Sequence, residues 1–304
     1  MKSDNIEIIV VDNGSFDGSA EFVQEKFPWV RTIVNSSNCG YALGNDIGAE
    51  AARGKYLIFM NNDTIVCDSN WVDFLTKHLE NDESIGIIGP LIIDANSKRV
   101  DSFGGAITYP LGAAPAIKHG CPESKLSSSM DVAYVAGAAL MIRKDLFERL
   151  GGFDPSYFAF HEEVDLCWRA RATGFRVLCE PRSRILHIGS ASWGSFSPMK
   201  EYLKERNRFV TNMKNYGPHD LLIWMTNEAI YAVSLTIGSF FTMKARKVLP
   251  YYFLAIFSFT KRIRSIVLNR KRCRASYAVS DAVVLSVHTN ESVPSMLVSA
   301  FRRR

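Results

Sequence analysis

The chain has 304 residues, of which 47% are hydrophobic and 22% are charged, which excludes a disordered protein and suits one large α/β domain with an extension, or two domains. The net charge of +5 comes from the C-terminal third, where 13 Lys and Arg face 4 Asp and Glu from His219 onward, against 23 and 27 before it. The basic balance therefore gives no reason to expect a nucleic-acid partner. The six cysteines show no CxxC pair and no metal-ligand spacing, which favours a reducing, cytoplasmic setting.

Short apolar runs alternate with helical patterns at the start of the chain. We predict strands at residues 6–11, 30–34, 55–60 and 85–93. Between them we predict helices at residues 20–27, within 38–54 and at 70–81. Nearly all-apolar strands that alternate with helices indicate a parallel sheet with both faces covered.

The pattern loosens between residues 94 and 130, where Gly, Pro, Ala and Ser predict a long loop or hairpin region of a kind that is often functional. Order returns at residues 131–142, and the helix predicted after it ends at Gly151 and Gly152. Further elements are two short strands and a long helix, at residues 175–181, 184–188 and 199–217.

Two aspartates follow predicted strands, Asp12 directly after the first and Asp63 just after the third. Ligands of a doubly wound sheet bind beyond the carboxyl ends of its parallel strands. An acid in such a place can also be a turn or cap residue, which is what we expect of Asp17 before the helix that starts near Ser19. Asp12 and Asp63 have no helix start close enough to cap, so we predict ligand roles for both.

Three glycines spaced by four, Gly40, Gly44 and Gly48, follow the second strand. Close packing of a helix on a strand explains Gly48, whereas Gly40 is expected to free the backbone of the loop. The segment has neither the GK[ST] of a P-loop nor the G-x-G-x-x-G of a Rossmann fingerprint.

Three carboxylates, Glu162, Glu163 and Asp165, lie within four residues at the start of a helical pattern. Acids in a first turn complement the helix dipole. This window by itself therefore favours the N-terminus of an ordinary amphipathic helix that Gly174 ends.

Six motifs stand in one order: "VVDNGSFDGS", "NCGYALGNDIG", "FMNNDT", "VAGAALMIRKDLFERLGGFD", "FHEEVDLCWRARATGFRV" and "ILHIGSAS". The series resembles the family 2 glycosyltransferases, in the branch that includes bacterial and archaeal rhamnosyltransferases. The resemblance implies a GT-A fold with a mainly parallel sheet flanked by helices, a nucleotide-sugar donor, a divalent metal and inversion at the anomeric carbon. We place the GT-A domain at residues 1–218, a helical extension at 219–275 and a loosely ordered tail at 276–304.

The resemblance also assigns individual residues to the donor. Asp12 matches the aspartate that hydrogen-bonds the nucleotide base, and Asp17 matches the second acid of that motif. The implied nucleotide site consists of Asp12, Asn13, Gly14, Ser15, Asp17, Gly40, Asn45 and Asn62. "NND" matches the family's DxD-type motif, so Asp63 would contact the metal, and Asn61 in place of the first acid would weaken metal affinity.

His187 matches a histidine that completes the metal site in some relatives. A histidine between two apolar runs is explained equally well as part of the core. Mg²⁺ and Mn²⁺ both suit carboxylate and phosphate oxygens, and a histidine ligand favours Mn²⁺.

"HEEVDL" aligns with the family's E-D-x-D-L stretch and makes Glu163 the catalytic base, one methylene longer than the usual aspartate. Glu162 and Asp165 are its neighbours at the site, and Asp165 is expected either to contact the acceptor or to hold the helix start. The implied reaction moves a sugar from dTDP-rhamnose or a UDP-sugar to a hydroxyl of a glycan or lipid-linked saccharide in cell-surface polysaccharide synthesis.

After Pro218 the chain is apolar enough to span a bilayer, although Asn227 and Glu228 lie inside this run. Basic clusters follow, and apolar blocks that alternate with basic ones over residues 221–274 suit helices at an anionic membrane surface. The alternative is a helical cap packed on the catalytic domain. Membrane contact fits a polyprenyl-linked acceptor and a peripheral location at the inner face of the cell membrane.

Two rival interpretations stand beside this one. A processive polysaccharide synthase is disfavoured because its Q-x-x-R-W signature is absent. A catalytically weak or inactive scaffold protein with the GT-A fold is the stronger rival, because relatives usually have a further strand, loop and helix before "VVDNGS". We therefore expect the first βα unit to be missing, which would leave the strand at residues 6–11 without one neighbour.

Overall fold

The structure is a computed structural model that describes residues 5–189 and 197–290. Its strands are β1 (Ile9–Asp12), β2 (Arg31–Val34), β3 (Tyr56–Met60), β4 (Thr64–Val66), β5 (Ile85–Asp94), β6 (Val100–Ser102), β7 (Thr108–Tyr109), β8 (Met130–Asp131), β9 (Ala139–Arg143), β10 (Arg176–His187) and β11 (Thr289–Asn290). Every strand predicted up to residue 93 is present. The two short strands predicted near residue 180 are one strand, β10, with an irregularity between Glu180 and Arg184.

The α-helices are α1 (Ser19–Lys26), α2 (Gly40–Ala51), α3 (Trp71–Asn81), α4 (Lys144–Leu150), α5 (Glu162–Ala172), α6 (Pro198–Asn215), α7 (Pro218–Gly238), α8 (Met243–Lys261), α9 (Ile263–Ala275) and α10 (Asp281–Leu285). Two 3-10 helices, η1 (Glu123–Lys125) and η2 (Pro155–Tyr157), lie in loops. The motif "ILHIGSAS" is described only to Gly189, and the rest of it lies outside the described residues.

A seven-stranded sheet forms the centre of the molecule, in the order β3-β9-β5-β10-β4, with β6 added to β5 and β8 added to β10. β5 and β10 run parallel, whereas the other pairings of this sheet are antiparallel. The mainly parallel sheet that we predicted is therefore mixed. The reason is that an apolar run indicates burial but not strand direction, and β9 enters between β3 and β5 in the reverse direction.

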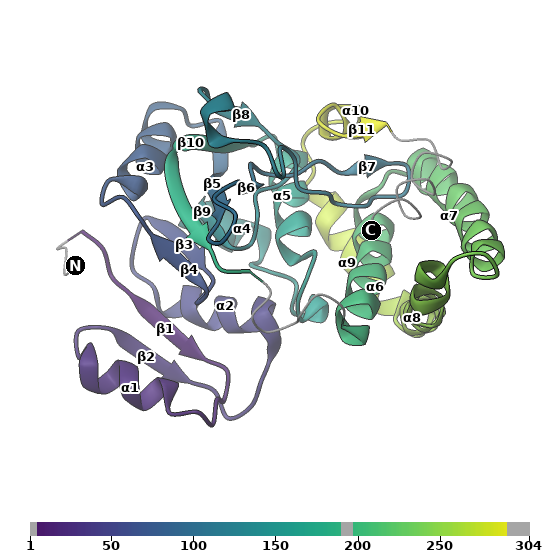
Figure 1. Cartoon of the computed structure of the whole chain (residues 1–304). Helices are drawn as coiled ribbons and strands as arrows, with labels where there is room; N and C mark the ends of the chain where they lie inside the picture. The colour runs from purple at the N-terminus through teal and green to yellow at the C-terminus, as the bar shows by residue number, and fades with distance from the viewer. Residues whose placement is uncertain (1–4, 190–196, 291–304) are drawn as a thin grey trace.

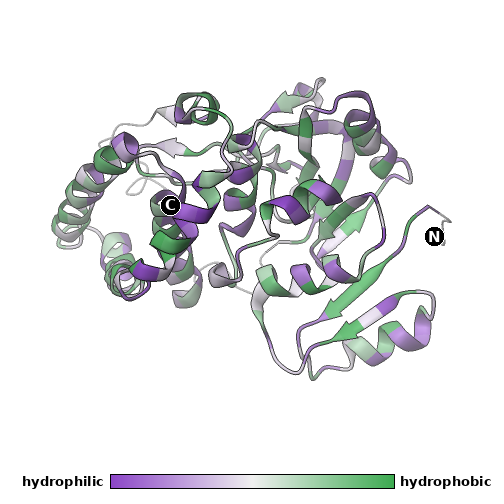
Figure 2. Cartoon of the chain, turned by 180° about the vertical axis from the view of Figure 1, so that it is seen from behind, coloured by the Kyte–Doolittle hydropathy of each residue, from purple (hydrophilic) through white to green (hydrophobic). Residues whose placement is uncertain are grey.

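β1 and β2 pair in parallel as a separate two-stranded sheet, which Figure 1 shows together with α1 at the lower left. Among the described residues, no strand pairs with the second edge of β1 or of β3. Figure 2 shows β1 and β2 as largely hydrophobic strands, and Ile8 just before β1 is 44% exposed.

The central sheet packs on both faces because its strands alternate their side chains between two apolar clusters. On one face, Trp71, Leu75 and Leu79 of α3 cover the sheet. On the other face, Leu146 and Phe147 of α4 and the buried helix α5, with Trp168 at its centre, complete the larger cluster. This packing on both faces fixes the position of the strands whose ends carry the predicted site.

Helices α6 to α9 lie beside the sheet, at the right in Figure 1. Arg208 of α6 pairs with Glu228 of α7 at 2.7 Å, and Tyr252 of α8 donates to the same carboxylate at 2.8 Å. The acid inside the apolar run is thus an ion-pair partner that joins three helices. α7 is the one helix of the described chain with the length and apolar composition to cross a membrane.

The described part of the tail is packed against the domain, so the prediction of a loosely ordered tail is wrong up to residue 290. Tyr277 donates to the Oδ1 atom of Asn215, Asp281 pairs with Arg274 at 3.1 Å, and β11 pairs in parallel with β7. Individual hydrogen bonds and ion pairs hold this segment, and such contacts leave no periodic pattern in the sequence. Residues 291–304 lie outside the described residues.

Candidate active site

The loop after β1 folds back on Asp12. This aspartate is buried, with 8% of its surface exposed, and it accepts a hydrogen bond from the Ser15 backbone N–H at 3.0 Å. Gly14 has a φ of 75°, and a Cβ there would lie 3.1 Å from the Ser37 Cα, so the turn favours glycine twice over.

Asn13 ties this loop to the start of α2. Its side-chain nitrogen donates to the Gly40 carbonyl at 3.0 Å, while its oxygen accepts from Asn35 at 2.9 Å and from the Cys39 thiol at 3.0 Å. The loop after β1 and the N-terminus of α2 therefore form one surface, as expected of a site beyond a strand end.

The other predicted nucleotide residues lie in different settings. Asp17 accepts from the Ser19 backbone N–H at 3.0 Å, so of the two roles expected from the sequence, turn or cap, it has the turn role, and Gly18 is the N-cap of α1. A contact of Asp17 with a nucleotide stays a prediction. Asn45 donates to the Tyr41 carbonyl one turn earlier in α2, at 2.9 Å. Asn62 is exposed.

Asp63 and His187 meet because β4 and β10 pair antiparallel at that point. The His187 Nε2 atom lies 3.3 Å from the Asp63 Oδ1 atom, and its Nδ1 atom lies 2.9 Å from the Asp101 Oδ2 atom. The hydrogen bond with Asp101 raises the pKa of His187, against the effect of burial, and Asp63 raises it further. The sequence did not point to Asp101, which is brought here by the pairing of β6 with β5.

This cluster fits a divalent cation in its chemistry. The Oδ1 atom of Asp63 is buried and accepts no hydrogen bond, and a carboxylate that orients a histidine is a usual companion of a metal ligand. Over residues 5–189 and 197–290, no three His, Cys, Asp or Glu residues group as a complete metal site. Asp63 and His187 would therefore need oxygen ligands from a bound substrate.

Glu162 and Glu163 occupy the first turn of α5 without hydrogen-bond partners for their Oε2 atoms. Burial and the neighbouring Glu163 raise the pKa of Glu162 well above its usual value. Burial also raises the pKa of Glu163, which backbone N–H groups and the Lys204 ammonium partly offset. Glu162 is 5% exposed, whereas Glu163 is half-buried, so the Glu163 side chain is the more exposed of the two although its Oε2 atom is buried.

The segment before β9 brings the three parts of the site together. The Gly137 carbonyl accepts from the Tyr41 hydroxyl of α2 at 2.8 Å, and a Cβ at Gly137 would lie 3.8 Å from the Glu163 Cδ. The next carbonyl, that of Ala138, accepts from the Asn61 backbone N–H at 3.0 Å. The start of α2, the "NND" segment and the acidic start of α5 are therefore neighbours.

Asp165 differs from the two glutamates because its charge is fully paired. It is buried and lies 2.8 Å from both Arg169 and Lys214, and Asn215 donates to it at 2.9 Å. Burial alone would raise the pKa of Asp165, but Lys214 and Arg169 outweigh burial and lower it to about 2. Of the two roles open to Asp165, the geometry favours the one that holds the helix start.

Replacing Asp165 by asparagine should lower the free energy of unfolding by about 3 to 5 kcal/mol, the usual loss when one partner of a buried ion pair is removed. Urea denaturation followed by circular dichroism measures it, with the exposed Asp73→Asn of α3 as the control. Because the Asp165 pKa is lowered in the folded state, its contribution should fade as the pH falls from about 4 towards 2. Equal stability of the two variants would contradict the structural role.

Comparison with known proteins decides the family. Residues 2–151 match the model described as Glycosyl transferase family 2. The chain belongs to this family. The recognition made from the six motifs is thereby confirmed.

The relatives of this chain include an O-antigen biosynthesis protein and a rhamnosyltransferase. It is 27% identical over 195 residues to the O-antigen biosynthesis protein RfbC of Myxococcus xanthus, which covers 62% of this chain and 15% of that protein. It is 27% identical over 210 residues to the N-acetylglucosaminyl-diphospho-decaprenol L-rhamnosyltransferase of Mycobacterium tuberculosis, covering 62% of this chain and 68% of that one. The match thus spans a small part of the first relative and about two thirds of the second.

Two solved structures confirm the GT-A fold of the glycosyltransferase. GalNAc-T7 with UDP, GalNAc and Mn²⁺ aligns with a TM-score of 0.50 at 22% identity, over 63% of this chain and 39% of that one. S. aureus TarS aligns with a TM-score of 0.51 at 14% identity, over 91% of this chain and 48% of that one.

Proposed function

We propose that the glycosyltransferase moves a hexose from a nucleoside-diphosphate sugar to an acceptor hydroxyl with inversion at the anomeric carbon. The observation that carries the proposal is the placement of Gly137 and Ala138, which contact the donor-side helix α2, the "NND" segment and Glu163 at once. A donor bound against Asp12 and Asp63 would present its sugar towards Glu163.

Glu163 would take the proton from the acceptor hydroxyl as the oxygen attacks the anomeric carbon. A general base works best when its pKa lies near the working pH, and burial moves the pKa of Glu163 in that direction. The glycosidic bond to the diphosphate breaks in the same step, and a divalent cation bound by Asp63 and His187 would offset the charge that develops on the leaving group.

The relatives support the proposed donor and acceptor classes. The mycobacterial relative is named as a rhamnosyltransferase for a diphospho-decaprenol acceptor, so dTDP-rhamnose or a UDP-sugar is the proposed donor, and a glycan or polyprenyl-linked saccharide is the proposed acceptor. Incubation with a panel of nucleotide sugars and Mn²⁺ or Mg²⁺, followed by nucleotide release, tests this. If the chain binds the donors tightly but releases nucleotide from none of them, the scaffold protein would be favoured instead.

We also propose that α7 and α8 lie on an anionic membrane surface. With Glu228 directed inwards, the outer face of α7 carries the apolar side chains of Leu222, Met225, Val233 and Ile237, all more than half exposed. The turn to α8 adds Phe240 at 75% and Phe241 at 82% exposure. Figure 2 shows this hydrophobic outer helix at the left.

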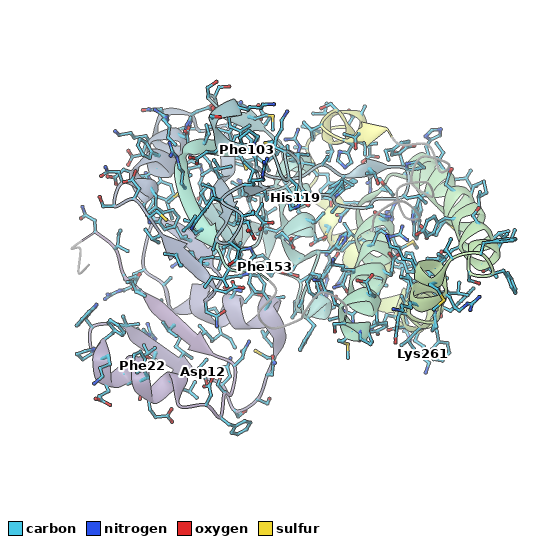
Figure 3. The ribbon with its side chains drawn as sticks, in the orientation of Figure 1. Asp12, Phe22, Phe103, His119, Phe153 and Lys261 are labelled. Atoms are coloured by element: carbon cyan, nitrogen blue, oxygen red, sulfur yellow. The ribbon has the colours of Figure 1, made fainter. Side chains whose placement is uncertain are left out.

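Basic side chains lie at both ends of α8. Lys244 and Lys247 follow the turn at the start of α8, and Lys261 ends α8, on the side of the molecule opposite to Asp12 and Phe22 in Figure 3. An apolar face bordered by lysines and arginines suits the interface of an anionic bilayer.

The full chain should float with vesicles of anionic lipid at low salt and less so at high salt, because salt screens surface charges. Replacing both Phe240 and Phe241 by serine should reduce the membrane partition coefficient by roughly tenfold or more, since each fully buried aromatic ring contributes about 1.5 to 3 kcal/mol. The control is Phe16→Ser, a fully exposed phenylalanine on the nucleotide side. A wild-type chain that stays unbound at low salt would refute the membrane proposal.

A further inference from the structure

Residues 157–161, here called the base loop, join η2 to α5 and have an unusual backbone. Phe158, Phe160 and His161 have φ values of 67°, 69° and 70°. At Phe158 the ψ is −62°, and the Ala159 N–H donates to the Tyr157 carbonyl at 2.8 Å, which is the strained form of the γ-turn. Side-chain-bearing residues keep such conformations only where surrounding structure over-determines them.

Asn207 of α6 supplies that constraint from one side. It is fully buried, and its amide nitrogen donates to three carbonyls of the base loop: those of Tyr157 at 3.0 Å, Ala159 at 2.8 Å and Phe160 at 2.6 Å. Two hydrogens shared among three acceptors fix the path of the loop.

Arg206 decides which way the Asn207 amide faces. Its Nε and Nη2 atoms lie 2.8 and 2.7 Å from the Asn207 Oδ1 atom, and Nη2 also donates to the Tyr157 carbonyl at 2.7 Å. Because a guanidinium can only donate, the amide oxygen must face Arg206 and the amide nitrogen must face the base loop.

The start of α2 holds the base loop from the other side. The Phe158 carbonyl accepts from the backbone N–H groups of Tyr41 at 2.6 Å and Ala42 at 3.3 Å. A Cβ at Gly40 would lie 2.5 Å from that carbonyl oxygen, so the close approach requires glycine. The Gly40 carbonyl also accepts from Asn13 in the loop after β1. The base loop therefore connects that loop to the start of α5.

We propose that Asn207 is a positioning residue, which holds the base loop so that Glu163, two residues beyond it, points at the acceptor hydroxyl. The inference rests on the proposed role of Glu163 as the base. Displacing a reacting group by about 1 Å can cost 10²-fold in rate, and Asn207 is the side chain that bonds this loop at three points.

Asn207→Asp tests the proposal because it removes both N–H donors, keeps the shape and leaves a carboxylate beside Arg206. We expect kcat to fall roughly tenfold or more, with the Kd for UDP or dTDP unchanged. Asn212→Asp is the matched control, a buried asparagine of the same helix that donates to the Leu111 carbonyl instead; its kcat should stay near that of the wild type.

The Glu163→Gln background separates positioning from a general loss of structure. If Asn207 acts through Glu163, Asn207→Asp should lower kcat no further once Glu163 is glutamine. The reason is that the effects of two substitutions on one coupled group of residues are not additive. A wild-type kcat in Asn207→Asp, or the same fold-loss in both backgrounds, would overturn the proposal. A fully active Glu163→Gln would instead refute the base assignment itself.

A second variant covers the case in which Asn207→Asp does not fold. Arg206→Lys keeps a positive charge but loses the two-point contact that orients the Asn207 amide. We expect a smaller loss of kcat in the same direction, again with unchanged nucleotide binding. Wild-type kcat in a folded Arg206→Lys chain would count against the positioning role.

Discussion

Replacing Glu163 by glutamine is expected to lower turnover by roughly 10²-fold or more, the usual contribution of a general base, while nucleotide-sugar binding stays near that of the wild type. The amide keeps the size of the carboxylate and cannot accept the acceptor's proton. Nucleotide release under saturating donor measures turnover, and calorimetric titration of the donor measures binding.

The pH dependence gives a second signature of Glu163. Since burial raises its pKa, turnover of the wild type should rise as the pH climbs through that raised pKa, because the base must be charged to act. Glu163→Gln should lose this acidic limb. The control is Glu162→Gln, which changes the neighbouring, more buried acid; an inactive Glu162→Gln beside an active Glu163→Gln would show that the roles are exchanged.

Replacing Asp63 by alanine is expected to weaken metal-dependent nucleotide binding by roughly tenfold to 100-fold, the loss that even an outer partner of a metal ligand causes. The reason is that the Asp63 Oδ1 atom is buried without a hydrogen bond and lies 3.3 Å from the His187 Nε2 atom, so a cation beside His187 would lie against this carboxylate. Titrating UDP and dTDP with Mn²⁺ or with EDTA should give a metal effect in the wild type and little in Asp63→Ala.

The matched control for Asp63 is Asp73→Ala, an exposed acid of α3. It should bind nucleotide with the metal dependence of the wild type. If wild type and Asp63→Ala bind UDP equally well in Mn²⁺ and in EDTA, then Asp63 does not hold a cation at this site.

The sequence alone determined those features of this protein that depend on residues close to one another in the chain. Short apolar runs with the period and length typical of strands predicted the positions of β1, β2, β3 and β5. Asp12 is the last residue of β1, and Asp63 follows β3 closely. The six motifs led to the family and the GT-A fold, both of which the comparisons support. The acidic first turn of α5 was also foreseen, since Glu162, Glu163 and Asp165 precede a helical spacing.

The tertiary structure decided which of these three acids is free. Asp165 is neutralised by Lys214 on another helix, whereas Glu163 is half-buried with an unpaired oxygen. In the same way Glu228, an acid inside an apolar run, proved to be the partner of Arg208. No window around either acid contains the partner from α6, so neither pairing could be predicted locally.

Asp101 and Asn207 show the same limit at the site itself. Asp101 reaches His187 through the pairing of β6 with β5, and Asn207 reaches the base loop across 47 to 50 residues of chain. A sequence pattern records burial and backbone preference over a few neighbouring residues. Which charges cancel, which amide holds which loop and which way β9 runs are long-range properties, and these depend on how the elements pack.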